Sequence, residues 1–159
     1  MTETPRPTRD APDIVGRPPL LFLASIALGA VLQRLLPLRL LPDGWGALPG
    51  AALVALAVVL FAWAIRTLRA AGTGIRKHQP TTTIVTGGPY RWSRNPIYLA
   101  FILCQLGIAL WANGAWLLLT LVPTLVVVRY GVIGREEAYL ERKFGREYLR
   151  YRQAVGRWL

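Results

Sequence analysis

The sequence contains one cysteine and one histidine in 159 residues. With Cys104 as its only cysteine, the chain has no intrachain disulfide and no cluster of cysteine ligands for a metal ion. With His78 as its only histidine, a catalytic triad and a histidine-rich metal site are both nearly excluded. We therefore expect no metal cofactor.

Acidic residues are also scarce, since eight Asp and Glu stand against 19 Lys and Arg and give a formal charge of +11. Such a charge can indicate nucleic-acid binding, but here the basic residues gather at the ends of apolar runs, as membrane topology requires. Hydrophobic residues make up 53% of the chain, and its mean hydropathy is positive. The composition therefore indicates one integral membrane domain surrounded by membrane lipids, with no nucleic acid as a partner.

Four apolar stretches with very little charge predict membrane-spanning helices, because about 20 residues are needed to cross a bilayer. The turn signal Pro42-Asp43-Gly44 separates the first two stretches. Only Asn113-Gly114 separates the last two, which predicts a tight helical hairpin. The expected spans are 18–36, 47–65, 97–112 and 114–130.

A further helix, predicted over 134–156, is amphipathic. Apolar and aromatic residues recur at helical spacing from Leu140 to Val155, and charged residues cover its other faces. Such a helix can lie on the membrane surface or cap the bundle. The predicted fold class is therefore all-α, an integral membrane helical bundle of about four transmembrane helices with a C-terminal cytoplasmic helix. Residues 1–17 are expected to form a disordered cytoplasmic tail before a membrane domain at 18–159.

Basic residues concentrate in the segment 66–96 and beyond residue 128, whereas the two opposite loops carry few. Cytoplasmic loops of membrane proteins have an excess of Lys and Arg. We therefore expect both termini and the 66–96 segment to be cytoplasmic, in a membrane of the bacterial inner-membrane type. The 66–96 segment and the C-terminal helix then lie on the same side, where they can meet.

The segment Gly87–Tyr98 combines three features of a polar-ligand site. Its glycines let the backbone turn tightly and approach a ligand closely. Arg91 and Arg94 are fixed positive charges suited to a carboxylate or phosphate, and the aromatic rings offer faces to an adenine or a cation. The alternative is an ordinary interfacial anchor, because Arg and aromatic residues gather at membrane surfaces in any case.

Glu136 and Glu137 begin the predicted C-terminal helix, and the hairpin brings them towards Arg94. A carboxylate pair near a low-dielectric interface needs cations or hydroxyls as partners. A ribose diol suits a glutamate, an amino-acid carboxylate suits Arg94, and a sulfonium suits tyrosine rings; together these groups describe S-adenosylmethionine. The alternative is that the two glutamates only favour a helix N-terminus through its dipole.

The segment before the third span and the predicted C-terminal helix each contain a motif. The motifs are Gly88-Pro89-Tyr90-x-x-x-Arg94-Asn95-Pro96-x-Tyr98 and Arg135-Glu136-Glu137-x-x-Leu140-x-x-x-Phe144-Gly145-x-x-Tyr148-x-x-Tyr151. Together they resemble the isoprenylcysteine carboxyl methyltransferase family, whose wider relatives are the phospholipid N-methyltransferases. The resemblance covers roughly residues 47–158. It implies a small membrane methyltransferase that binds S-adenosylmethionine on its cytoplasmic side. The acceptor would be a lipid-like or prenyl-cysteine-like molecule that arrives from within the bilayer.

The resemblance implies a set of cofactor-binding residues but no catalytic base. Asn95 departs from the family, in which His is common, and it cannot titrate near neutrality although it keeps a donor and an acceptor. A carboxylate acceptor would need no base, whereas an amine or a thiol would have to lose a proton. The expected cofactor-binding residues are Gly88, Tyr90, Arg94, Asn95, Pro96, Tyr98, Glu136 and Glu137.

Two other functions stay open. One is a nicotinamide-dependent membrane reductase, since sterol reductases resemble this family in their C-terminal part, although they need more spans than 159 residues supply. The other is a non-catalytic membrane module that binds a lipid or a protein partner, which would leave the arginine and glutamate residues without a task.

Overall fold

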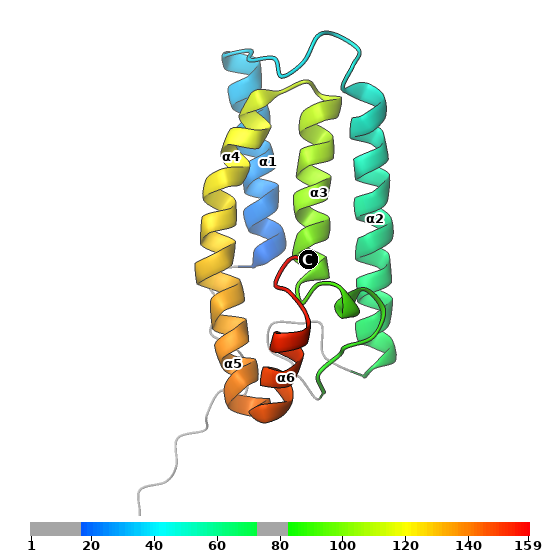
Figure 1. Cartoon of the computed structure of the whole chain (residues 1–159). Helices are drawn as coiled ribbons and strands as arrows, with labels where there is room; N and C mark the ends of the chain where they lie inside the picture. Colours follow the sequence, from blue (N-terminus) through cyan, green and yellow to red (C-terminus); the bar gives the residue numbers. More distant parts are fainter. Residues whose placement is uncertain (1–16, 73–82) are drawn as a thin grey trace, which may run out of the picture.

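The computed structural model describes residues 17–72 and 83–159, and all regular structure in them is helical (Figure 1). The all-α expectation is thus confirmed, whereas His78 and nearly all of the expected N-terminal tail lie outside the described residues. The elements are α1 (Pro18–Leu35), α2 (Ala47–Ala70), the 3-10 turn η1 (Gly88–Arg91), α3 (Pro96–Trp111), α4 (Ala115–Val127), the π-helical stretch η2 (Val128–Ile133), α5 (Gly134–Phe144) and α6 (Arg146–Ala154).

Helices α1 to α4 form a bundle in which α2 packs mainly on α3, and α1 packs mainly on α4 (Figure 1). Glycines let the helix backbones approach closely. A Cβ on Gly50 of α2 would lie 2.7 Å from the carbonyl oxygen of Gly107 on α3, and a Cβ on Gly29 of α1 would lie 2.9 Å from the Cα of Leu117 on α4. Small residues at helix interfaces are typical of membrane bundles, where close packing replaces the hydrophobic effect between helices.

A buried polar contact ties α1, α3 and α4 together. The fully buried Gln105 donates from Nε2 to Ser25 Oγ at 2.7 Å and to the carbonyl oxygen of Leu117 at 2.9 Å. Thr120 donates its hydroxyl to the carbonyl oxygen of Ser25 at 3.0 Å. In an apolar environment an unpaired polar group costs several kcal/mol, so these bonds favour one register of the three helices.

Within the described residues, three helices are long and apolar enough to cross a membrane: α1, α2 and the continuous helix Ala115–Phe144. Helix α3 has 16 residues and rises about 24 Å, which is less than the roughly 30 Å of a hydrocarbon core. The prediction of about four spans thus corresponds to three long helices with a shorter one packed among them. The long helices expose apolar side chains such as Leu48 and Val59 to their surroundings, as an integral membrane protein requires.

The helix predicted over 134–156 is wrong as a single element. Its first part, α5, continues from α4 through η2, since Gly134 keeps a right-handed φ of −60° and no proline interrupts the stretch. The helix ends instead at Gly145, where φ is +52°, a value that glycine adopts far more readily than other residues. Helix α6 then takes a new direction (Figure 1). The span predicted over 114–130 is therefore the first part of a longer helix.

The two ends of the bundle differ in character. The short connections 36–46 and 112–114 lie at one end, and the start of α1, η1, α5 and α6 lie at the other (Figure 1). Asn113, with φ of +48°, forms the predicted tight turn between α3 and α4. Helix α3 begins short of the neighbouring ends of α2 and α5, so that the residues just before it lie between those two ends.

Candidate functional site

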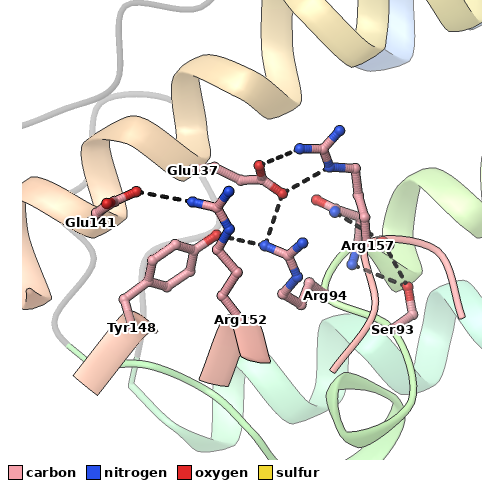
Figure 2. A network of polar contacts seen from close by, with 8 residues as sticks. Ser93, Arg94, Glu137, Glu141, Tyr148, Arg152 and Arg157 are labelled. Atoms are coloured by element: carbon pink, nitrogen blue, oxygen red, sulfur yellow. Dashed lines mark hydrogen bonds and ion pairs between the residues drawn. The ribbon is translucent and has the colours of Figure 1, made fainter. Parts of the chain in front are cut away.

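The base of α3 and the start of α5 meet through an ion pair between Arg94 and Glu137 (Figure 2). Arg94 Nη1 lies 2.9 Å from Glu137 Oε1, and the two side chains are only 9% and 10% exposed. A pair buried to this degree is screened by water much less than a surface pair. The structure therefore brings together the two parts of the predicted site, which are the segment before α3 and the glutamates of α5. In this structure Arg94 and Glu137 bind each other.

Glu137 has a second cationic partner that the sequence did not predict. Arg157 donates from Nε to Oε1 at 3.0 Å and from Nη2 to Oε2 at 2.6 Å, a bidentate arrangement that suits the planar guanidinium. The hydrogen bond to Glu137 raises the pKa of Arg157. Since Arg157 follows the end of α6 and belongs to no motif, only the tertiary fold shows that it reaches Glu137.

Glu136 has a different partner from its neighbour. Tyr98 donates its hydroxyl to Glu136 Oε1 at 2.8 Å, and the Tyr98 side chain is buried on α3. The two adjacent glutamates thus diverge, one towards two guanidinium groups and the other towards a tyrosine hydroxyl. The Arg94–Glu137 ion pair and the Tyr98–Glu136 hydrogen bond both link the first turn of α5 to the base of α3.

Two tyrosines of α6 complete the cluster. Tyr148 accepts a hydrogen bond from Arg94 Nη1 at 3.1 Å (Figure 2), and Tyr151 donates to the carbonyl oxygen of Tyr90 at 2.7 Å. Burial raises the pKa of Tyr90, Tyr148 and Tyr151 above the ordinary value for tyrosine. All three therefore remain neutral at physiological pH, and none of them is a ready base.

The residues before α3 shape the backbone of the site. Gly88 has φ of +56°, and a Cβ there would lie 2.6 Å from the Thr67 hydroxyl of α2. Pro96 is buried at the first position of α3, where its fixed φ suits a helix start. Asn95 donates from Nδ2 to the carbonyl oxygen of Arg157 at 3.1 Å. The assignment of Gly88, Asn95 and Pro96 to a cofactor pocket stays a prediction.

The aromatic rings are not arranged as open faces for a ligand. Tyr90 and Tyr98 are only 8% and 9% exposed, so that their rings pack inside the protein. Trp92 is exposed and lies edge-on to Trp63 of α2, with ring centroids 5.5 Å apart. The exposed Trp92 ring of this segment thus lies against α2, as in the aromatic belts of membrane interfaces.

These observations define a class of protein: a helical membrane protein with a buried site of arginine, glutamate and tyrosine at one end of its bundle. The chain belongs to the phospholipid methyltransferase family, whose model matches residues 45–147. This match includes Arg94, Tyr98, Glu136 and Glu137, and it confirms the family resemblance predicted from the motifs. The family is one of membrane methyltransferases.

A relative from Haemophilus influenzae, described only as an uncharacterized protein, is 43% identical over 63 residues. The aligned residues are 40% of this chain and 100% of the relative. Its description carries no statement of activity.

Proposed function

We propose that this protein transfers a methyl group from S-adenosylmethionine to a lipid-like or prenyl-cysteine-like acceptor at the cytoplasmic face of the membrane. Membership of the phospholipid methyltransferase family supports methyl transfer. The observation that carries the cofactor assignment is the buried ion pair of Arg94 and Glu137, which the half-buried Arg157 joins at the base of α3. A nicotinamide-dependent reductase is not favoured, because the family match is to methyltransferases.

The donors and acceptors of the cluster suit the polar groups of S-adenosylmethionine. Arg94 Nε is buried and has no hydrogen-bond partner among the described residues. Because buried donors are nearly always paired in the functional state, an amino-acid carboxylate is a fitting partner for this atom. The carboxylates of Glu136 and Glu137 are suited to a ribose diol, since each carboxylate has about four acceptor positions.

The chain's own contribution to the reaction is alignment and the exclusion of water. S-adenosylmethionine supplies a methyl group that its positive sulfonium has already activated. Arg94 and the two glutamates would fix the orientation of that group through charge-assisted hydrogen bonds, which are shorter and stronger than neutral ones. Gly88 and Pro96 would hold the backbone around it, while Tyr98 keeps Glu136 in place.

Burial raises the pKa values of Tyr90, Tyr148 and Tyr151, so that these hydroxyls are not ready bases, and the carboxylates of Glu136 and Glu137 are the proton acceptors of the cluster. The simplest acceptor for this site arrives without its proton and needs no base. A carboxylate, a free amine or a thiolate satisfies this condition. Catalysis would then rest on proximity, which can supply roughly 7–11 kcal/mol of a barrier.

The position of the site suits an acceptor held in the bilayer. Because α3 begins short of the ends of α2 and α5 (Figure 1), we place the site near the level at which the lipid-facing helices would leave a membrane. A molecule with an apolar chain can remain among the lipids while its polar end reaches this level. Basic residues at the same end support a cytoplasmic orientation for this end and for both termini: Arg66, Arg69, Arg91, Arg129, Arg135, Arg142 and Arg146.

Ligand-induced thermal shifts of the purified protein in nanodiscs test the cofactor assignment. We expect S-adenosylmethionine and S-adenosylhomocysteine to raise the unfolding temperature and NADPH to leave it unchanged, since a ligand stabilises only the state that binds it. A shift with NADPH and none with S-adenosylmethionine would contradict the proposal. Transfer of labelled methyl groups to lipid extracts, with and without the protein, then identifies the acceptor.

A further inference from the structure

The residues after α6, numbered 155–159, run back across the base of α3, and we call them the C-terminal strap (Figure 1). The backbone N–H of Arg94 donates to the carbonyl oxygen of Gly156 at 3.0 Å. Trp158 packs against the core cluster that contains Tyr98. The strap is therefore anchored by a main-chain bond at one residue and by an aromatic side chain two residues later.

Side chains of the segment before α3 hold the strap at a third point. Asn95 Nδ2 and Ser93 Oγ both donate to the carbonyl oxygen of Arg157, at 3.1 Å and 3.4 Å. Figure 2 shows Ser93 next to Arg157, opposite the face on which Arg157 meets Glu137. The backbone of Arg157 is thus fixed on one side while its guanidinium extends to the carboxylate on the other.

The hydrogen bonds at Glu137 leave room for a further donor. Oε1 accepts from Arg157 Nε and lies 2.9 Å from Arg94 Nη1 in an ion pair, and Oε2 accepts from Arg157 Nη2. A carboxylate has about four acceptor positions, so that among the described residues one position remains at Oε2. A hydroxyl is a suitable donor for this position, and the bidentate Arg157 fixes the orientation of the carboxylate.

We propose that Arg157 is a positioning residue for Glu137 and that the C-terminal strap is a fixed wall of the methyltransferase site. This inference rests on the proposed function, because it assigns Glu137 to a ribose hydroxyl. Arg157 lies outside residues 45–147, which match the family, and the family match therefore does not assign it. The three anchors fix the strap against the base of α3.

A double-mutant cycle tests this proposal. The affinity for S-adenosylhomocysteine is measured by isothermal titration in nanodiscs for the full chain, Arg157→Ala, Glu137→Gln and the double variant. We expect Arg157→Ala and Glu137→Gln each to weaken binding about tenfold, the effect of losing one charged hydrogen bond. The double variant should bind no more weakly than Glu137→Gln, because a residue that acts through Glu137 has nothing left to position.

Arg152→Ala is the matched control. This substitution also removes one arginine charge, but from α6 and not from the strap. Arg152 pairs with Glu141 at the surface, where the two side chains are 45% and 43% exposed. Exposed pairs of this kind contribute little, so binding should be unchanged. Arg157→Lys keeps the charge and loses the bidentate geometry, and it should bind more tightly than Arg157→Ala and more weakly than the unaltered protein.

Three results would overturn the proposal. If Arg157→Ala lowers the affinity by the same factor in the unaltered chain and in Glu137→Gln, that result would show that Arg157 contacts the ligand directly. Tighter binding by Arg157→Ala would show that Arg157 competes with the ligand, and unchanged binding would show no role. Failure of the unaltered protein to bind would instead overturn the proposed function. Thermal unfolding of the same four proteins without ligand measures the coupling of Arg157 and Glu137, and no coupling would show that Arg157 does not position Glu137.

Discussion

Tyr98 and Glu136 lie 38 positions apart in the sequence and are joined by a hydrogen bond of 2.8 Å. Tyr98→Phe removes only the hydroxyl and leaves the carboxylate without this donor, which costs about 1–3 kcal/mol in a buried site. We expect a lower free energy of unfolding, measured by chemical denaturation in detergent. Tyr130→Phe, at an exposed tyrosine of η2, is the control. Equal free energies of unfolding of the two variants would show that the bond does not stabilise the fold.

Gly88→Ala should destabilise the protein more than Gly44→Ala. Both glycines have positive φ, +56° and +86°, so both substitutions introduce backbone strain of about 1–3 kcal/mol. A Cβ on Gly88 would also lie 2.6 Å from the Thr67 hydroxyl, whereas nothing lies within 4 Å of a Cβ on Gly44. Thermal unfolding in detergent measures the difference, and a larger loss from Gly44→Ala would contradict the described packing of η1.

Asn95→His should be tolerated, and Asn95→Asp should not. Asn95 donates to the carbonyl oxygen of Arg157, and an imidazole N–H can make the same bond. An ionised Asp has the size of Asn but only accepts hydrogen bonds, so two acceptors would face each other. We expect the affinity for S-adenosylhomocysteine to be retained in the first variant and reduced about tenfold in the second. Equal affinities would remove Asn95 from the site.

Cysteines placed at positions 43 and 150 should be labelled from opposite sides of the membrane, after Cys104 has been replaced by Ser. Asp43 lies in the connection between α1 and α2, and Arg150 lies on α6 at the other end of the bundle. We expect a membrane-impermeant reagent to reach position 43 from outside intact cells and position 150 only after the cells are opened. Labelling of position 150 in intact cells would overturn the proposed orientation.

Much of the architecture could be predicted because local rules agree with the global fold. Pro18 and Pro96 begin helices, as their fixed φ favours, and Asn113 makes the turn between two apolar runs. The break at Gly145 was not predicted, because apolar spacing continues across it and a single glycine within a helical pattern does not reveal its φ. The continuation of α4 into α5 was hidden by a change from apolar to charged composition.

The site could be predicted only in part. The spacing of the two motifs indicated that Arg94 and Glu137 lie close together, and the structure places them 2.9 Å apart. The motifs did not indicate their direct pairing or the role of Arg157, because the choice of partner depends on how α6 and the strap fold back. The burial of the Tyr90 and Tyr98 rings could likewise not be predicted from the sequence, since aromatic residues at an interface can face the protein or its surroundings.

The titration of S-adenosylhomocysteine into the protein in nanodiscs, with and without Arg94→Ala, tests the central claim most directly. We expect one saturable site in the unaltered protein. Loss of a charged hydrogen bond of roughly 1.5–3 kcal/mol should weaken it about tenfold to a hundredfold in a variant that still elutes as a folded protein. Absence of binding by the unaltered protein, or equal binding by folded Arg94→Ala, would contradict the account.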